Sequence, residues 1–146
     1  MKINLDIDGK YDDTEITIRA PHLNSDIERI VAMMRMIDMQ IAVRKDNETY
    51  LLETDRILYI EAVDRKTFVY TATESYESEL KLYELEQDLI ARDFLRISKQ
   101  SIVNLRKIKS LKADVNRKIR ITLQNGEQIV VSRMYSDELR RKLGLR

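Results

Sequence analysis

The sequence predicts a mainly β protein of the α+β class, in which short helices accompany a larger number of strands. Apolar and polar residues alternate through many short stretches, which is the pattern of half-buried strands. Several of these stretches are rich in β-branched and aromatic residues, as strands commonly are. Asn125-Gly126 lies between two of them and gives the strongest hairpin signal that a short sequence can carry.

The amino-acid composition excludes several classes of enzyme and metal-binding protein. The chain has 146 residues, no cysteine, one histidine (His22) and three glycines. It therefore lacks thiol nucleophiles and the ligands of common zinc sites, and it cannot build a glycine-rich phosphate loop or a dinucleotide fingerprint. We expect a protein that is not an enzyme and holds no cofactor or metal. No stretch has the length of a membrane span or the apolar core of a signal peptide, so we expect no membrane insertion and a cytoplasmic location.

Basic residues are concentrated in the last part of the chain. The formal net charge is only +1, but residues 1–91 hold 11 Lys and Arg against 20 Asp and Glu, whereas residues 92–146 hold 15 against 5. Such a segment suits a polyanion partner, because cations that neutralise phosphates release condensed counterions. The alternative is a solvated basic face that only complements the acidic part of the chain.

Residues 1–44 are predicted to form a small ββα extension. Alternating apolar residues at 3–7 and at 16–18 indicate two half-buried strands on either side of a turn at Gly9, and these strands would pair as a hairpin. A helix is expected after Pro21, because Asn24 or Ser25 can cap it. Methionines widen its apolar stripe, which suits core packing or, alternatively, a dimerisation or regulatory surface. The stripe includes Met34, and the methionines that widen it are Met33, Met36 and Met39.

Residues 45–146 are predicted to form the second domain. The boundary near residue 44 is soft, because it falls between two predicted strands that are joined by a polar turn. Strands are expected at residues 41–43, 49–52, 57–62, 68–72 and, as an edge strand, 76–80. A short acidic helix should follow over residues 82–90. Arg65 and Lys66 lie at the tip between the third and fourth of these strands, where side chains project freely. Their alternative role is solubility alone.

The rest of the chain is organised around residues 94–104. This stretch begins as a strand, in which Arg96 separates two apolar residues, and ends in the apolar pair Ile102-Val103. Between them lies a polar loop, Ser98–Ser101, which we call the knuckle. Because both of its ends would be held in a core, Lys99 and Gln100 should project outward, where a cation and an amide can meet phosphates and base edges.

Three more strands and a helix are expected after the knuckle. The strands are predicted over residues 108–113, 118–123 and 128–132, and the helix from Ser136 or Asp137 to Leu143, with Gly144 as its C-cap. Arg133 would then lie where the last strand leaves the sheet. Its planar guanidinium could pair with two acceptors of a guanine or a phosphate. Alternatively, Arg133 could have a structural role and hold the C-terminal helix in place. Arg106 and Lys107, just past the knuckle, are further candidates for phosphate contacts.

Residues 94–104 with Ile108, residues 123–126, and Val131-Ser132-Arg133-Met134-Tyr135 together resemble the LytTR-type DNA-binding domain of bacterial LytR/AlgR-like transcription regulators. The resemblance covers about residues 41–144. It implies an elongated, mostly β fold that sets loops, rather than a recognition helix, into successive major grooves. It also implies that DNA meets Arg65, Lys66 and Thr67 at the tip, Lys99 and Gln100 in the knuckle, and Arg133. Ser98 and Gln100 depart from the residues that many relatives carry, histidine and serine.

Response regulators of this family commonly carry an N-terminal receiver domain. About 44 residues are too few for such a doubly wound domain, so we expect no built-in receiver. The extension would instead govern homodimerisation or receive a signal from a separate protein. The leading hypothesis is a sequence-specific regulator that binds double-stranded DNA. RNA recognition by the sheet and a protein-adaptor role are the alternatives, although no paired aromatic stacking motif favours RNA.

Overall fold

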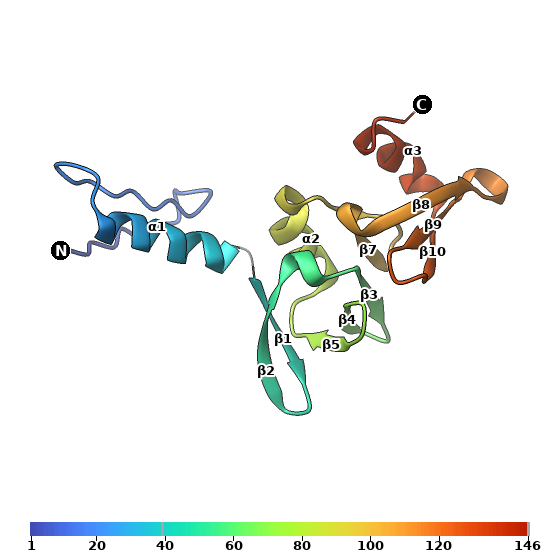
Figure 1. The fold of residues 1–146 in the computed structure, drawn as a ribbon, viewed down its shortest axis with the longest axis horizontal. Coiled ribbons are helices and arrows are strands. Elements are labelled where there is room, and N and C mark those ends of the chain that lie inside the picture. The colour runs from blue at the N-terminus through green and yellow to red at the C-terminus, as the bar shows by residue number, and fades with distance from the viewer. Residues whose placement is uncertain (39, 146) are drawn as a thin grey trace. The chain divides into compact units, whose positions relative to one another are not determined.

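The structure is a computed structural model that describes residues 1–38 and 40–145 (Figure 1). By its contacts the chain divides into two units, Met1–Arg35 and Met36–Arg146, and each is described by itself. None of the described helices is long and apolar enough to cross a bilayer. The helices and strands are α1 Ser25–Asp38, β1 Gln40–Lys45, β2 Glu48–Glu53, β3 Tyr59–Val63, β4 Lys66–Tyr70, β5 Ser75–Ser78, α2 Leu82–Leu89, β6 Phe94–Arg96, β7 Ser101–Asn104, β8 Ile108–Ala113, β9 Ile119–Leu123, β10 Gln128–Val131 and α3 Arg133–Lys142. Short 3-10 turns lie at η1 Thr54–Arg56, η2 Ile90–Arg92, η3 Leu105–Lys107 and η4 Val115–Arg117.

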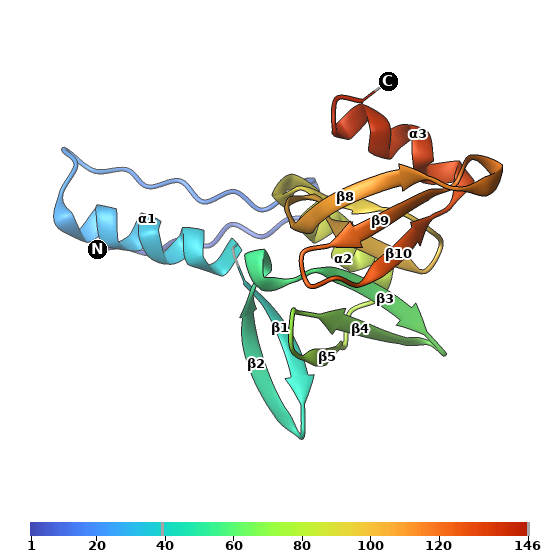
Figure 2. The same cartoon turned by 45° about the vertical axis from the view of Figure 1, so that its right-hand side comes forward.

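Two sheets make up the second unit. One has seven strands in the order β2-β1-β5-β4-β3-β7-β6, and the other has three in the order β10-β9-β8. Every strand pair in both sheets is antiparallel. Figure 2 shows β8, β9 and β10 side by side, with α3 next to them. The predicted mainly β, α+β fold is confirmed.

The strands around β7 contribute to two hydrophobic cores. The first core gathers residues of α2 and the seven-stranded sheet, and the second gathers residues of both sheets and α3. Ile102 belongs to the first core and its neighbour Val103 to the second, and both side chains are fully buried. Phe94 and Leu95 on β6 divide in the same way. Since adjacent strand residues point to opposite faces, β6 and β7 are packed from both sides, which fixes the loop between them.

Tyr59 links the two sheets. It lies on β3, and its hydroxyl donates a hydrogen bond to Oε2 of Glu127, in the turn between β9 and β10, at 2.9 Å. Its ring stacks on that of Tyr70, with centroids 4.5 Å apart. Burial, followed by the hydrogen bond to Glu127, raises the pKa of Tyr59 well above its ordinary value. The neutral phenol is therefore the form that the fold holds.

Short turns join the hairpins as the sequence suggests. Gly126, between β9 and β10, has a φ of +91°, a conformation that glycine adopts without strain, and its N–H donates to the carbonyl oxygen of Leu123 at 2.9 Å. The Asn-Gly hairpin is thus confirmed. Asp64 and Arg65, between β3 and β4, have φ values of +50° and +68°. Two consecutive left-handed residues match the strand twist in a two-residue hairpin, so Arg65 projects from a tight tip.

Two predicted elements differ in the structure. The strand predicted at an edge, β5, lies inside the sheet, because it pairs with β4 on one side and with β1 on the other. The last helix begins at Arg133 rather than at Ser136 or Asp137. Ser132 is its N-cap, and the hydroxyl of Ser136 donates to the carbonyl oxygen of Ser132 at 3.0 Å, which supports the first turn. At the other end Gly144, with a φ of +71°, closes the helix as predicted.

In the first unit, α1 is capped by Asn24, whose Oδ1 accepts a hydrogen bond from the backbone N–H of Ile27 at 3.1 Å. The predicted hairpin ahead of it is wrong, because residues 1–24 contain no strand. Instead, both figures show this stretch as an extended chain beside α1. The contact division falls between Arg35 and Met36, and β1 pairs with β2 over its full length.

Candidate nucleic-acid interface

The knuckle is shaped by the side chain of Arg96. Its Nε donates to the carbonyl oxygen of Ser98 at 2.7 Å, and its Nη2 donates to that of Lys99 at 2.5 Å. Ser98 adds a local turn, because its hydroxyl accepts a hydrogen bond from the N–H of Gln100 at 3.1 Å. The side chains of Lys99 and Gln100 are exposed, as the sequence predicted.

Arg96 is itself held in place. Its Nη1 lies 3.6 Å from Oε1 of Glu86 on α2, and only 19% of its side chain is exposed. A guanidinium that donates to two carbonyl oxygens and forms an ion pair with a carboxylate is a structural group, because fewer of its five donors remain for a ligand. In the sequence Arg96 is simply the polar residue between two apolar ones, Leu95 and Ile97. An arginine two residues before a polar loop was the signal available.

A backbone hydrogen bond joins the knuckle segment to the start of α3. The N–H of Ser132 donates to the carbonyl oxygen of Ile97 at 2.9 Å. Arg133 follows as the first residue of α3 and is exposed. It therefore stands beside the knuckle at the N-terminus of α3, two residues after the end of β10, where the last strand leaves the sheet as predicted. Thirty-five positions separate Ser132 from Ile97 in the sequence, so only the fold brings these segments together.

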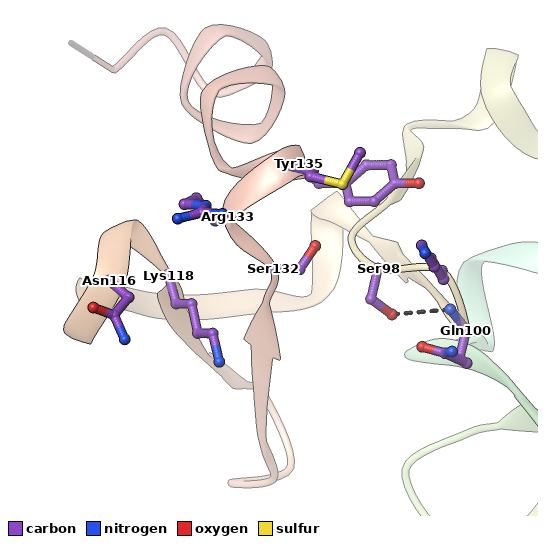
Figure 3. A pocket seen from close by; sticks show the side chains of 9 residues that line it. Ser98, Gln100, Asn116, Lys118, Ser132, Arg133 and Tyr135 are labelled. Carbon is purple, nitrogen blue, oxygen red and sulfur yellow. Dashed lines mark hydrogen bonds between the residues drawn. The ribbon is translucent and has the colours of Figure 1, made fainter.

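An open depression lies between the knuckle, the η4 turn and the start of α3 (Figure 3). Three cations, Lys99, Lys118 and Arg133, are exposed around it. None of the three forms an ion pair with any residue in the described part of the chain. The full lining is Ser98, Lys99, Gln100, Asn116, Lys118, Ser132, Arg133, Met134 and Tyr135. Free cations beside amides and an exposed apolar side chain offer contacts for phosphates, base edges and a thymine methyl group.

Lys118 was not among the predicted site residues. It follows η4, a turn that Asp114 holds by accepting a hydrogen bond from the N–H of Val115 at 2.8 Å and by pairing with Nη2 of Arg120 at 3.0 Å. The bond from the Val115 N–H, followed by Arg120, lowers the pKa of Asp114. Arg120 is thus neutralised while Lys118 stays unpaired. In the sequence, Arg117, Lys118 and Arg120 are simply basic residues at the start of a predicted strand. Their order does not reveal which of them forms an ion pair.

The tip between β3 and β4 lies at the same end of the sheet as the knuckle. The N–H of Ala62, next to the tip, donates to the carbonyl oxygen of Gln100 at 2.8 Å. Arg65 and Lys66 are exposed there, although they do not line the depression. Thr67 is buried, with 6% exposed, because β4 runs between two other strands. Its predicted contact with DNA is not available to a buried side chain.

Arg106 and Lys107 lie at the other end of β7 from the knuckle, in η3. Nε of Arg106 pairs with Oδ2 of Asp93 at 2.8 Å. Lys107 lies beside the β9–β10 end of the small sheet, since its carbonyl oxygen accepts a hydrogen bond from the N–H of Gln124 at 3.0 Å. The structure therefore does not bring these two residues together with Lys99, Gln100 and Arg133.

Several known proteins are similar to this chain. A family model described as "LytTr DNA-binding domain" matches residues 47–144. Two proteins of Staphylococcus aureus, each described as an uncharacterized HTH-type transcriptional regulator, are 28% (strain MSSA476) and 27% (strain NCTC 8325) identical, and each match covers 99% of both chains.

A solved structure is similar as well. It is the LytTr DNA-binding domain of a putative methyl-accepting/DNA response regulator from Bacillus cereus, which is 26% identical to this chain. The two structures superpose with a TM-score of 0.69, and the match covers 73% of this chain and 98% of the other.

Proposed function

This chain belongs to the LytTr DNA-binding domain family, and on that premise we propose that it is a transcription regulator whose loops enter the major groove of duplex DNA at specific sequences. The observation that supports this most is the group of unpaired, exposed cations around one depression, Lys99, Lys118 and Arg133. They come from three segments that are remote in sequence. A backbone hydrogen bond, from Ser132 to Ile97, joins two of those segments.

Loops, rather than a recognition helix, suit this fold as the DNA-contacting elements. Among the described α-helices, α2 and α3 are separated by five strands. They therefore cannot form the two consecutive helices, joined by a tight turn, of a helix-turn-helix motif. The knuckle and the tip, in contrast, are short turns with exposed polar side chains and firmly paired strands behind them. Such turns can be narrow enough to enter a major groove, which is about 12 Å wide.

Each side chain has a role that follows from its chemistry. Arg133 can donate two hydrogen bonds to O6 and N7 of one guanine, and the amide of Gln100 can pair with N6 and N7 of an adenine. Lys99 and Lys118 are compact charges that suit phosphates. Arg65 at the tip, with Lys66 beside it, would contact the next part of the duplex at the same end of the sheet. Arg106 and Lys107 keep their predicted phosphate role only if DNA also reaches the η3 end.

The regulator is proposed to act as a homodimer in the cytoplasm. Two copies would place two equivalent interfaces on paired half-sites about one helical turn apart. The first unit, Met1–Arg35, would hold the copies together or receive a signal from a separate protein. Its exposed methionines on α1, Met33 at 59% and Met34 at 38%, favour a contact surface of this kind.

Selection of bound sequences from a random pool of duplex DNA tests the proposal. We expect enrichment of paired half-sites, and we expect Arg133→Ala to lose that enrichment while it retains weak binding at low salt. Single-stranded RNA is the competitor, because it was the main alternative ligand. A protein that enriches no sequence, or that releases DNA to RNA at equal concentration, would not be the proposed regulator.

A further inference from the structure

The first unit leaves two strand-like segments without a partner. Residues 2–7 and 14–19 both alternate apolar and polar side chains, yet residues 1–24 form no strand. The apolar side chains in these segments are exposed: Ile3 77%, Leu5 82%, Ile7 90%, Ile16 61% and Ile18 40%. A pattern that favours a sheet, together with unpaired backbone, is a template for pairing with another chain.

Charge disfavours pairing of the two segments with each other. A hairpin that aligns Leu5 with Ile16 places Asp6 opposite Glu15 and Lys2 opposite Arg19. Like charges directly opposite one another destabilise a strand pair. The shift by two residues that aligns Ile7 with Ile16 keeps the apolar side chains on one face and still places an acid, Asp8, opposite Glu15. In the structure the two segments are joined by a turn, in which the N–H of Tyr11 donates to the carbonyl oxygen of Asp8 at 3.2 Å, but they form no strand pair.

The second segment is complementary to itself. When residues 15–19 are laid antiparallel against the same residues of another copy, with Thr17 opposite Thr17, Glu15 faces Arg19 twice and Ile16 faces Ile18 twice. Both ion pairs and both apolar pairs favour this register. Four of the six residues from Thr14 to Arg19 are β-branched, which suits a strand. This pairing has a two-fold axis at Thr17, and two-fold symmetry is the commonest symmetry of homodimers.

We propose that residues 14–19 pair antiparallel with the same segment of a second copy of this chain, about an axis at Thr17. This inference deepens the homodimer of the proposed function and rests on it. A two-stranded ribbon alone is marginally stable in water, so further apolar surface is needed. On α1, Met33 and Met34 are exposed and offer that surface in each copy. Because each match to the relatives from S. aureus covers 99% of this chain, each relative has residues aligned with this segment.

Cysteine crosslinking of the full chain tests the register, because the chain has no cysteine of its own. Thr17→Cys places two thiols opposite one another, and we expect mild oxidation to give a disulfide-linked dimer in high yield. Asp12→Cys, exposed in the turn, is the control for random collision. Glu15→Cys and Arg19→Cys chains should crosslink to each other when mixed, and much less when each is alone.

Leu5→Cys distinguishes the proposed pairing of residues 14–19 from a second possible self-pairing, that of residues 2–8. Residues 2–8 could also pair with themselves, about Leu5, because Lys2 would then face Asp8. High yield for Leu5→Cys with background yield for Thr17→Cys would overturn the proposal. So would equal yields for Thr17→Cys and Asp12→Cys.

Charge reversal gives a second test that needs no cysteine. Glu15→Arg alone should raise the dimer dissociation constant roughly tenfold, since it replaces two attractive pairs by two repulsive ones. The double variant Glu15→Arg with Arg19→Glu should restore it, as sedimentation of the full chain can measure. If the double variant stays as weak as the single one, the register is wrong. Sequence-specific DNA binding by a chain without any such dimer would remove this inference and leave the proposed DNA recognition intact.

Discussion

The backbone N–H of Ser132 donates to the carbonyl oxygen of Ile97 at 2.9 Å. This bond joins the last residue before α3 to the residue before the knuckle. The side chain of Ile97 is fully buried in the second core, so the acceptor has little freedom to move. Arg133 and Lys99 are therefore held in a fixed relation, and binding need not order one loop against the other. Preorganisation of this kind reduces the entropic cost of association.

Arg133→Ala tests whether Arg133 contacts a base. If it pairs with a guanine, the variant should lose about 1–3 kcal/mol of binding free energy on the selected site and little on random DNA. Arg141→Ala is the matched control, because Arg141 lies near the other end of the same helix and pairs with Glu138. Fluorescence anisotropy at fixed salt measures both. Equal losses on both DNAs would make Arg133 a phosphate contact.

Arg96→Lys tests the shape of the knuckle. A lysine keeps the charge but cannot donate to two carbonyl oxygens in a fixed fork, so the backbone at Ser98 and Lys99 should loosen. We expect roughly tenfold weaker binding to the selected site, because each hydrogen bond from a charged group contributes a net of about 1.5–3 kcal/mol. Faster amide hydrogen exchange at residues 98–100 should accompany the loss. Weaker binding without faster exchange would indicate that Arg96 contacts DNA itself.

The salt dependence of DNA binding by Lys118→Ala and by Lys107→Ala tests which end of β7 lies against the DNA. Lys118 is near the knuckle, and Lys107 is in η3. A lysine that neutralises one phosphate contributes about 0.9 to the slope of log K against log salt concentration. Lys118→Ala should therefore lower that slope by about one, on cognate and random DNA alike. Lys107→Ala should leave it unchanged, because Lys107 lies at the η3 end. A change of slope for Lys107→Ala would show that DNA reaches this end as well.

Tyr59→Phe tests the link between the sheets. The variant removes the hydrogen bond to Glu127, which remains in reach of water, so the free energy of unfolding should fall by about 1 kcal/mol. The pKa of Tyr59 is raised in the folded state, so its contribution is complete below pH 10 and is lost as pH rises above that value. The difference between wild type and variant should therefore shrink at high pH. Urea unfolding at pH 7 and above pH 10 measures it.

Asn104→Ala tests the anchor at the other end of β7. The Asn104 side chain is 1% exposed, donates to the carbonyl oxygen of Ile57 at 2.9 Å and accepts from the N–H of Arg106 at 3.1 Å. Removing it leaves both backbone groups without that partner, so we expect a loss of about 1–3 kcal/mol in the free energy of unfolding. Asn125→Ala, in the exposed turn between β9 and β10, should cost much less.

Much of the β architecture was predictable because it is encoded locally. Alternation placed β1 to β4 and β8 to β10 close to their observed positions, and the Asn125-Gly126 turn was correct because φ > 0 is a local requirement. The N-terminal hairpin was wrong for a reason that alternation does not express. The same pattern suits any partner strand, and the charges of Glu15 and Arg19 disfavour the partner within the chain.

The site was predictable only in part. Lys99, Gln100 and Arg65 are exposed in turns, and Lys66 is exposed at the start of β4, as their sequence positions suggested. Thr67 is buried because β4 is flanked by strands on both sides, which its position in the sequence does not show. Arg106 and Lys107 follow the knuckle closely in sequence, but an intervening strand carries the chain to the opposite end of the sheet.

By itself the sequence determined the class of fold, the strands and turns, and the excess of positive charge in the later part of the chain, since each depends on neighbouring residues or on composition. Only the tertiary structure decided which cations meet. It brings Lys118 and Arg133 close to the knuckle. It also makes Arg96 a hydrogen-bond donor to the knuckle's backbone and neutralises Arg120 in an ion pair with Asp114. The physical reason is that pairing and burial are set by residues far apart in the chain, whose contacts no local pattern records.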